Sequence, residues 1–503
     1  MMQLKHRCQT CAISRLVVIV VVVAFAVRLG YGVCRYKRQL LLSDNAFITI
    51  WHHDALYHVL IAKGILEKHE YVVSPPPSGP VLRYQGEPAL FKAPAYQYFL
   101  AGIFKVSGFS FAFFPLQALA GSLMCGIVAL IANRAFQNPI AAYYAGLTAA
   151  VHPILVNSAS QPYNENVFFF LFMVSIWAFV LWTEQNKPAM AVLSGLSMGL
   201  CALTRESGLL ICAGFVAALM QKSLVINRKR AAFGLAIVLG SASVVVFPWV
   251  IGNHLKYHTG LLISGISGPD FVDGNNECLV KESALLPYSA EHGCPPLRTE
   301  LSFRLHHYEF DRTIPTAIRV HLVCVQMAKE FLRENFSGYG KLVFRRLWTT
   351  LLPFSPRGPQ GWYERIALSF YWIAVFPLGF VGIVIQARKG FDSIHALLLS
   401  ILLIYVAAIA AVLYWSDLRF RLGSDLILGC FAGSALVSAL EKSKSHCLLP
   451  PVMPLVTKCF HGTHHSRVAH TTRLSLCGAF PTKPRRSPLC RLAKTSSGRR
   501  PHC

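Results

Sequence analysis

Several charged side chains that stand beside apolar runs are the residues of this sequence most suited to chemistry. A charged group near the hydrocarbon core of a bilayer costs free energy unless it is paired or binds a ligand, so such residues are candidates for a functional site. In the membrane topology that the basic loops favour, all of them fall on one face of the membrane, where they could form a single interfacial site. They are Asp54, Lys92, Glu165, Arg205, Glu206, Asp417, Arg419 and Arg421.

Asp54 could act as a general base that removes the proton of an acceptor hydroxyl. It also stands at the start of a predicted helix, where aspartate is a favoured N-cap, and the two roles are compatible. With the preceding His53, its carboxylate could ligate a divalent metal ion. Polar and aromatic neighbours in the same segments are assigned to the substrate pocket: Tyr57, His58 and Tyr96.

Three basic residues could bind an anionic group such as a phosphate. Lys92 precedes a predicted membrane-surface helix and is either an interfacial anchor or a point charge on the phosphate. Arg419 and Arg421 flank an apolar run on the outer face, where basic residues are uncommon, and this favours anion binding. The other charged candidates either contact a substrate or form structural ion pairs; they are Glu165, Arg205 and Glu206.

The composition requires elements that cross a membrane. Of the 503 residues, 54% are hydrophobic and 14% are charged, whereas a soluble globular chain carries about 25% charged residues. Apolar runs recur along the chain, and we therefore predict an all-α, polytopic membrane protein with about ten transmembrane helices. The runs lie at 16–27, 112–132, 140–156, 167–182, 188–204, 207–220, 232–251, 366–386, 393–414 and 424–440.

The distribution of Lys and Arg among the short loops gives the orientation. If the N-terminus is cytosolic, most of these residues fall on the cytosolic face, as positive-inside topology requires. Arg35, Lys37 and Arg38 are exceptions. The first run, 16–27, could instead belong to a cleaved signal peptide, and the segment after it would still emerge on the outer face.

Two of the predicted outer loops, 34–111 and 252–365, are long enough to hold structure of their own. In the first, 56–66 and 95–106 have the pattern of amphipathic helices that lie on the membrane surface. In the second, 318–333 has the spacing of a helix. If the second loop faces an oxidising compartment, a disulfide is expected between two of its cysteines, and otherwise both are free thiols. These are Cys278 and Cys294.

The net charge of +25 does not indicate nucleic-acid binding, because Lys and Arg lie mainly in short loops and in the tail 441–503. This tail shows no hydrophobic periodicity and is predicted to be disordered. The part that precedes it, 1–440, holds all the apolar runs and is predicted to be one transmembrane domain.

The candidate residues belong to short motifs in a definite order: Asp-Ala-Leu-Tyr at 54–57, Lys-Ala-Pro-Ala-Tyr at 92–96, a glycine-rich run ending in Thr-Arg at 195–205, Pro-Trp at 248–249, and Asp-Leu-Arg-Phe-Arg at 417–421. In this order and spacing the chain resembles the GT-C superfamily of glycosyltransferases that use polyprenyl-phosphate sugars. The superfamily includes the protein O-mannosyltransferases and the aminoarabinose transferase of lipid A. The resemblance covers roughly residues 10–440.

That resemblance implies direct transfer of a sugar from a polyprenyl- or dolichyl-phosphate carrier, with inversion, to an acceptor on the non-cytosolic face. Asp54 would be the general base, and Lys92, Arg419 and Arg421 would bind the donor phosphate. Members also use a divalent ion, so a metal at His53 and Asp54 is a candidate cofactor. No nucleotide-binding motif is evident, so no nucleotide cofactor is expected. A multi-pass transporter or flippase for lipid-linked sugars is the alternative, because it would share the spans and their charges.

The predicted partners are the lipid bilayer and a lipid-linked sugar, with no nucleic acid. The chain is expected to be a multi-pass protein of a bacterial inner membrane, with the endoplasmic reticulum membrane as the alternative, and with its N-terminus in the cytosol. The sequence specifies neither the sugar nor the acceptor.

Overall fold

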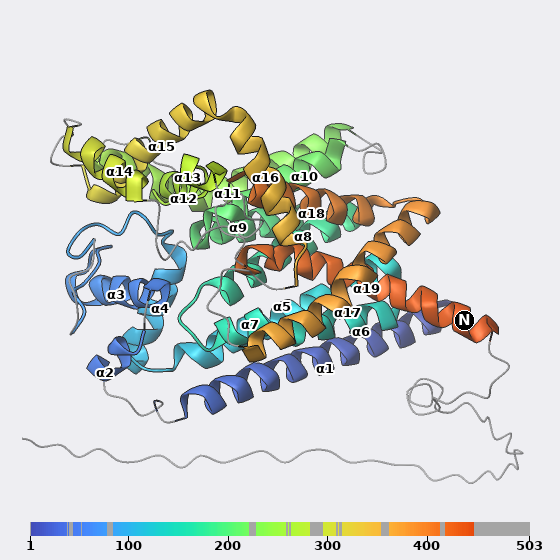
Figure 1. Cartoon of the computed structure of the whole chain (residues 1–503). Coiled ribbons are helices and arrows are strands. Elements are labelled where there is room, and N and C mark those ends of the chain that lie inside the picture. The colour runs from blue at the N-terminus through green and yellow to red at the C-terminus, as the bar shows by residue number, and fades with distance from the viewer. Residues whose placement is uncertain are drawn as a thin grey trace, which may run out of the picture. The chain divides into compact units, whose positions relative to one another are not determined.

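The computed structural model describes a chain that is helical almost throughout (Figure 1). Beyond the helices, the described residues form only turns, bends and two isolated β-bridges. Residues 441–446 of the predicted disordered tail 441–503 are instead part of the last helix, and the rest of the tail lies outside the described residues. The described residues are 2–37, 39, 44–51, 53–77, 84–220, 228–257, 260, 263–281, 295–307, 310, 314–353, 362–412 and 418–446.

The helices follow one another with short connections. In chain order they are α1 (Met2–Tyr36), α2 (Asp44–Thr49), α3 (His53–Lys68), α4 (Ala95–Ser107), α5 (Phe113–Phe136), α6 (Pro139–Ala150), α7 (Pro153–Ala159), α8 (Glu165–Gln185), α9 (Pro188–Thr204), η1 (Glu206–Leu209), α10 (Leu210–Met220), α11 (Arg228–Tyr257), α12 (Ser267–Gly274), α13 (Glu277–Lys281), α14 (Pro295–His307), α15 (Thr316–Glu334), α16 (Phe336–Thr350), α17 (Trp362–Lys389), α18 (Ser393–Val412) and α19 (Leu418–His446).

The predicted all-α, polytopic architecture is confirmed, with fewer candidate spans among the described residues than the roughly ten that the sequence predicts. Among the described residues, 7 helices are long and apolar enough to cross a membrane, or 8 if the bent pair α6 and α7 is one span. That pair bends by 52° because Pro153 starts α7 and cannot donate the backbone hydrogen bond of a continuous helix. The runs 188–204 and 207–220 form helices shorter than the roughly 20 residues that a span requires.

Small residues permit the close helix contacts of the bundle. α9 packs along α11, and a side chain at Gly195 would begin 2.2 Å from the carbonyl oxygen of Val238. In the same way, Gly382 of α17 lies directly against the backbone of Phe431 in α19. Small residues favour helix association in a membrane because they let two backbones approach to van der Waals contact. These contacts hold α9 and α19, whose ends carry candidate site residues.

The predicted helices of the two outer loops are present. The expected helices 56–66 and 95–106 correspond to α3 and α4, which pack against each other (Figure 1). The expected helix 318–333 lies within α15, which packs along α12. Cys278 is disulfide-bonded, whereas Cys294 lies outside the described residues, so the pairing of these two cysteines stays a prediction.

Candidate active site

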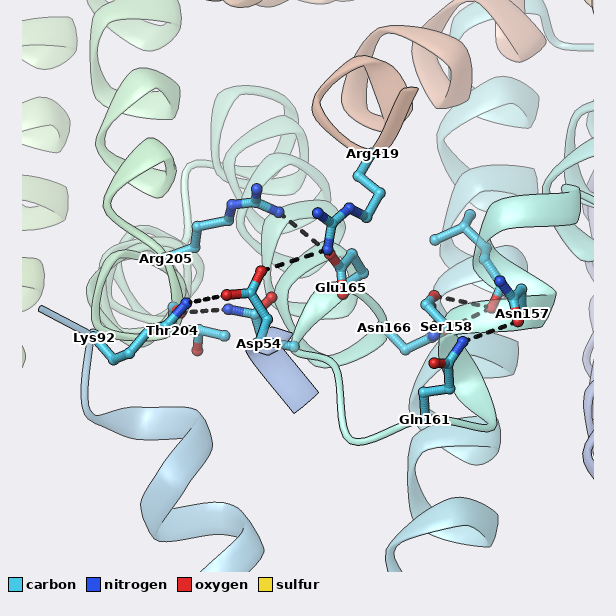
Figure 2. A network of polar contacts seen from close by, with 12 residues as sticks. Asp54, Lys92, Asn157, Ser158, Gln161, Glu165, Asn166, Thr204, Arg205 and Arg419 are labelled. Atoms are coloured by element: carbon cyan, nitrogen blue, oxygen red, sulfur yellow. Dashed lines mark hydrogen bonds and ion pairs between the residues drawn. The ribbon is translucent and has the colours of Figure 1, made fainter. Parts of the chain in front are cut away.

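Five charged residues from five separate segments meet at one place (Figure 2). Each lies at the end of a helix, which is why residues so far apart in sequence can converge. Asp54 and Glu165 lie in the first turns of α3 and α8. Arg419 lies in the first turn of α19, Arg205 follows the last residue of α9, and Lys92 shortly precedes α4.

Ion pairs connect these five residues into one network, the charge cluster. The Lys92 Nζ atom lies 2.8 Å from Oδ1 of Asp54, and an Arg419 nitrogen lies 3.7 Å from Oδ2 of the same carboxylate. Arg419 also lies 3.8 Å from Glu165, and Arg205 approaches the same Glu165 oxygen to 3.6 Å. Three cations therefore surround two carboxylates, which leaves positive charge for an anionic ligand.

Backbone contacts hold the segments that carry the charge cluster. The Tyr71 hydroxyl donates a 2.9 Å hydrogen bond to the carbonyl oxygen of Lys92. The Asn164 side chain donates to the carbonyl oxygen of Thr204 at 3.1 Å, which joins the start of α8 to the end of α9. The backbone nitrogen of Gly265 donates to the Leu90 carbonyl oxygen at 2.7 Å, so the segment before α12 is joined to the Lys92 segment.

Asp54 is an ionised carboxylate at neutral pH. The Lys92 ammonium, which acts against the effect of burial and is assisted by Arg419, holds the pKa of the Asp54 carboxyl far below its usual range. The Asp54 side chain is still 44% exposed, so a substrate can approach it. Asp54 can therefore accept a proton once the cations beside it are drawn elsewhere.

Glu165 is buried and has an unused hydrogen-bond acceptor. Its side chain is 3% exposed, and its Oε2 atom has no hydrogen-bond partner among the described residues. A buried carboxylate oxygen without a donor is unfavourable, and in native proteins such atoms are nearly always paired. The hydroxyl of a bound sugar or an ordered water would supply the missing donor.

The three residues assigned to the substrate pocket pack α3 against the Lys92 segment and α4. His58 and Tyr96 are buried with ring centroids 5.0 Å apart, and Gln97 hydrogen-bonds His58 at 2.9 Å. Burial, together with the nearby Lys92 charge, lowers the pKa of His58 to about 3, so this ring is neutral at physiological pH. Tyr57 lies edge-on to Phe91 at 5.2 Å. Contact of these three residues with substrate stays a prediction.

Arg421 and Glu206 lie outside the ion pairs of the charge cluster. The structure brings Arg421 to Asp425, at 3.1 Å, instead of to Asp54. Glu206 is adjacent to Arg205 in sequence, but its side chain hydrogen-bonds Ser264. Because Arg421 pairs with Asp425, its position does not support the prediction that it binds one phosphate together with Lys92 and Arg419.

The described residues give no support for the predicted metal site. No group of three His, Cys, Asp or Glu side chains in the described part of the chain could hold a metal ion. Both oxygens of Asp54 already face cations, whereas a divalent ion in this place would need several oxygen or nitrogen ligands. The His53 side chain and Asp417 lie outside the described residues, so metal binding stays a prediction and no step is assigned to it.

Two residues near the charge cluster were not among the candidates from the sequence. The Tyr163 ring lies under the Arg419 guanidinium, 5.5 Å from ring centroid to carbon, an arrangement that favours the cation. Asp270 of α12 lies within electrostatic range of Lys92, Asp54 and Arg205. Tyr163 is uncharged and Asp270 does not adjoin an apolar run, so neither has the signal of a charged residue beside such a run.

Residues 91–251 match the family described as dolichyl-phosphate-mannose-protein mannosyltransferase. The matched segment contains Lys92, Glu165 and Arg205 of the charge cluster. The match covers less than half of the 503 residues, and it shows a similarity of this segment to that family. This is the kind of family that the order and spacing of the motifs resemble.

Two solved structures are similar to this chain. ArnT from Cupriavidus metallidurans bound to undecaprenyl phosphate has 13% sequence identity and a TM-score of 0.36, over 89% of this chain and 82% of that chain. The apo state of the same protein has 14% identity and a TM-score of 0.33, with the same coverage. No curated protein sequence matches the chain.

Asp270 gives an expected pH dependence to the binding of an anionic donor at the charge cluster. Burial raises the pKa of Asp270 to about 7, although nearby Lys92 acts in the opposite direction. Below that pH the group is neutral, and above it the new carboxylate repels a donor phosphate whose own charge does not change. The donor KM should therefore rise as pH increases from about 6 to about 8, and it should stay flat in Asp270→Asn. Identical pH profiles of donor KM in the two proteins would contradict this assignment.

Proposed function

We propose that the charge cluster catalyses direct, inverting transfer of a sugar from a polyprenyl or dolichyl phosphate to an acceptor hydroxyl on the non-cytosolic face. In this mechanism Asp54 is the general base, and Lys92 and Arg419 stabilise the leaving phosphate. The observation that carries the proposal is the Asp54 carboxylate, which lies between these two cations at 2.8 Å and 3.7 Å.

The position of the charge cluster at the ends of spans supports a lipid-linked donor. The span Glu165–Gln185 begins with Glu165, and the span Arg421–Ser443 begins two residues after Arg419. The ends of spans lie near the membrane–water interface. A lipid phosphate occupies that same level, because its tail stays in the hydrocarbon and its charged group stays in water. The non-cytosolic orientation is inferred from the loop charges, and the bacterial inner membrane or the endoplasmic reticulum would supply the donor.

Donor binding would activate the base. In the free protein, Lys92 keeps the pKa of Asp54 low and so makes its carboxylate a weak base. A donor phosphate competes for Lys92 and Arg419, and the pKa of Asp54 then rises toward that of an effective base. The acceptor oxygen attacks the anomeric carbon from the face opposite the phosphate and its proton goes to Asp54. The carbon–oxygen bond to the phosphate breaks, and the lipid phosphate leaves with the bonding electrons.

Reconstituted protein tests the proposed function. The protein is placed in liposomes that contain a labelled polyprenyl-phosphate sugar, and a panel of hydroxyl acceptors is added on either side. We expect the label to move to an acceptor from the lipid donor, with inverted anomeric configuration, and no label to move from a nucleotide sugar. Movement of intact lipid-linked sugar across the bilayer without cleavage would instead identify a flippase and overturn the proposal.

A further inference from the structure

A second polar cluster is buried next to the start of α19, which also carries Arg419. It consists of Arg421 and Asp425 of α19 and of His152, which stands at the break between α6 and α7. The Arg421 Nε atom lies 3.1 Å and 3.2 Å from the two carboxylate oxygens of Asp425, and His152 Nε2 lies 3.2 Å from the same carboxylate. All three side chains are at least nine-tenths buried. Buried charged groups of this kind are rare and need a reason.

Arg421 also binds the backbone beyond the end of α16. Its guanidinium donates to the carbonyl oxygen of Thr350 at 3.1 Å and to that of Leu352. α16 is itself fastened by Arg346, which donates to the Ala410 carbonyl oxygen in α18 at 2.8 Å. Arg421 therefore joins the start of α19 to the end of α16. Its Nε and Nη1 atoms donate to this framework.

Arg419 stands two residues before Arg421 in the same helical turn. Successive residues of an α-helix are rotated by about 100°, so residues two apart point to nearly opposite faces. When Arg421 is fixed on the buried face, Arg419 is consequently held on the face toward the charge cluster. There it reaches both Asp54 and Glu165. The first turn of a helix is the part most prone to fraying, and an anchor in that turn would suppress this.

We propose that Arg421, clamped by Asp425 and two backbone carbonyls, is a positioning residue that holds Arg419 over Asp54 and Glu165. The inference rests on the proposed function, because the role of Arg419 on the donor phosphate is part of that function. It replaces the sequence prediction that Arg421 binds the phosphate itself. The clamp acts only through Arg419, and this makes it testable by a double-mutant cycle.

The cycle uses Arg421→Gln, Arg419→Gln and the double variant, with donor KM and kcat measured for each in liposomes. We expect Arg421→Gln to raise donor KM by about tenfold, in the range of measured couplings between neighbouring residues. In the Arg419→Gln background the same change should have no further effect on donor KM. If Arg421 bound the phosphate directly, or if its role were only structural, its effect would persist in that background and the proposal would be overturned.

Two further variants keep the test decisive. Asp425→Asn leaves the carbonyl contacts of Arg421 but weakens the clamp, so it should raise donor KM less than Arg421→Gln does, and only when Arg419 is present. This variant also serves if Arg421→Gln does not fold. Arg28→Gln is the matched control, because Arg28 is a fully buried arginine on α1 that donates to the carbonyl oxygens of Ala149 and Ala150. Arg28→Gln should lower the melting temperature without changing donor KM.

The outcomes distinguish this inference from the proposed function. If Arg419→Gln alone leaves donor KM unchanged, the role of Arg419 in the proposed function is wrong, and the positioning role falls with it. If Arg419→Gln raises donor KM but Arg421→Gln and Asp425→Asn do not, the proposed function stands and only the positioning role is overturned.

Discussion

Replacement of Asp54 by asparagine should lower kcat for sugar transfer by about 10²–10⁴-fold, the range typical for loss of a positioned general base. The amide keeps the size of the side chain but cannot accept the acceptor proton. Donor KM should stay the same or fall, because Lys92 loses its carboxylate partner at 2.8 Å and becomes available to the donor phosphate. Initial rates at saturating lipid donor, with donor KM determined separately, measure both expectations.

A change on the same helix provides the control for Asp54. Glu67 also lies on α3, where it pairs with Lys63 at 3.7 Å on the surface and its side chain is 52% exposed. Exposed pairs of this kind contribute little to stability, so Glu67→Gln should transfer sugar at nearly the wild-type rate. Asp54→Asn that folds normally and keeps more than about a tenth of wild-type kcat would remove Asp54 from the mechanism.

The convergence of the charge cluster could be predicted because it follows from topology alone. Asp54, Glu165 and Arg419 all adjoin apolar runs, and alternating spans bring their ends to one face of the membrane. A hydropathy pattern cannot say which side chains on that face touch. The structure adds this information, because it brings Arg419 within 4 Å of both carboxylates.

The sequence does not show that Arg419 and Arg421 point to different faces, because the start of their helix cannot be read from it. The apolar run was placed at 424–440, which would leave both arginines in a loop and free to turn the same way. The helix in fact begins at Leu418, so Arg419 and Arg421 are helical and point to different faces. Hydropathy marks only the apolar part of a helix, and Arg419 and Arg421 precede that part.

The excess of predicted spans and the omission of Asp270 have different causes. A hydropathy pattern locates apolar runs, but it does not give the lengths of the helices or the positions of breaks. Here α9 has 17 residues, and Pro153 starts a new helix after α6. Asp270 is brought near Lys92 by the contact of Gly265 with Leu90, a pairing between two loops far apart in sequence. No local pattern encodes such a contact, so Asp270 could be identified only in the folded chain.

Replacement of Lys92 by glutamine should lower kcat/KM for the lipid donor by about 10²–10³-fold, the usual loss when one stabilising donor to a developing negative charge is removed. Lys92 is also the main reason that the pKa of Asp54 is low. Without Lys92 that pKa rises, and Asp54 becomes protonated at mildly acidic pH. Since only the carboxylate can accept a proton, and kcat/KM reports the protonation state of the free enzyme, kcat/KM of Lys92→Gln should fall as pH decreases through the raised pKa. The wild type should show no such limb, because its Asp54 stays ionised there.

Lys92→Arg and Lys63→Gln separate these two effects from a general loss of basic charge. Arginine keeps the positive charge beside Asp54, so Lys92→Arg should retain the wild-type pH profile even if altered geometry lowers its rate. Lys63 carries the same charge on α3 but pairs with Glu67, so Lys63→Gln should leave both rate and profile unchanged. If Lys92→Gln loses activity but its kcat/KM, like that of the wild type, does not fall at acidic pH, Lys92 acts only on the phosphate. Its ion pair with Asp54 would then have no part in setting the strength of the base.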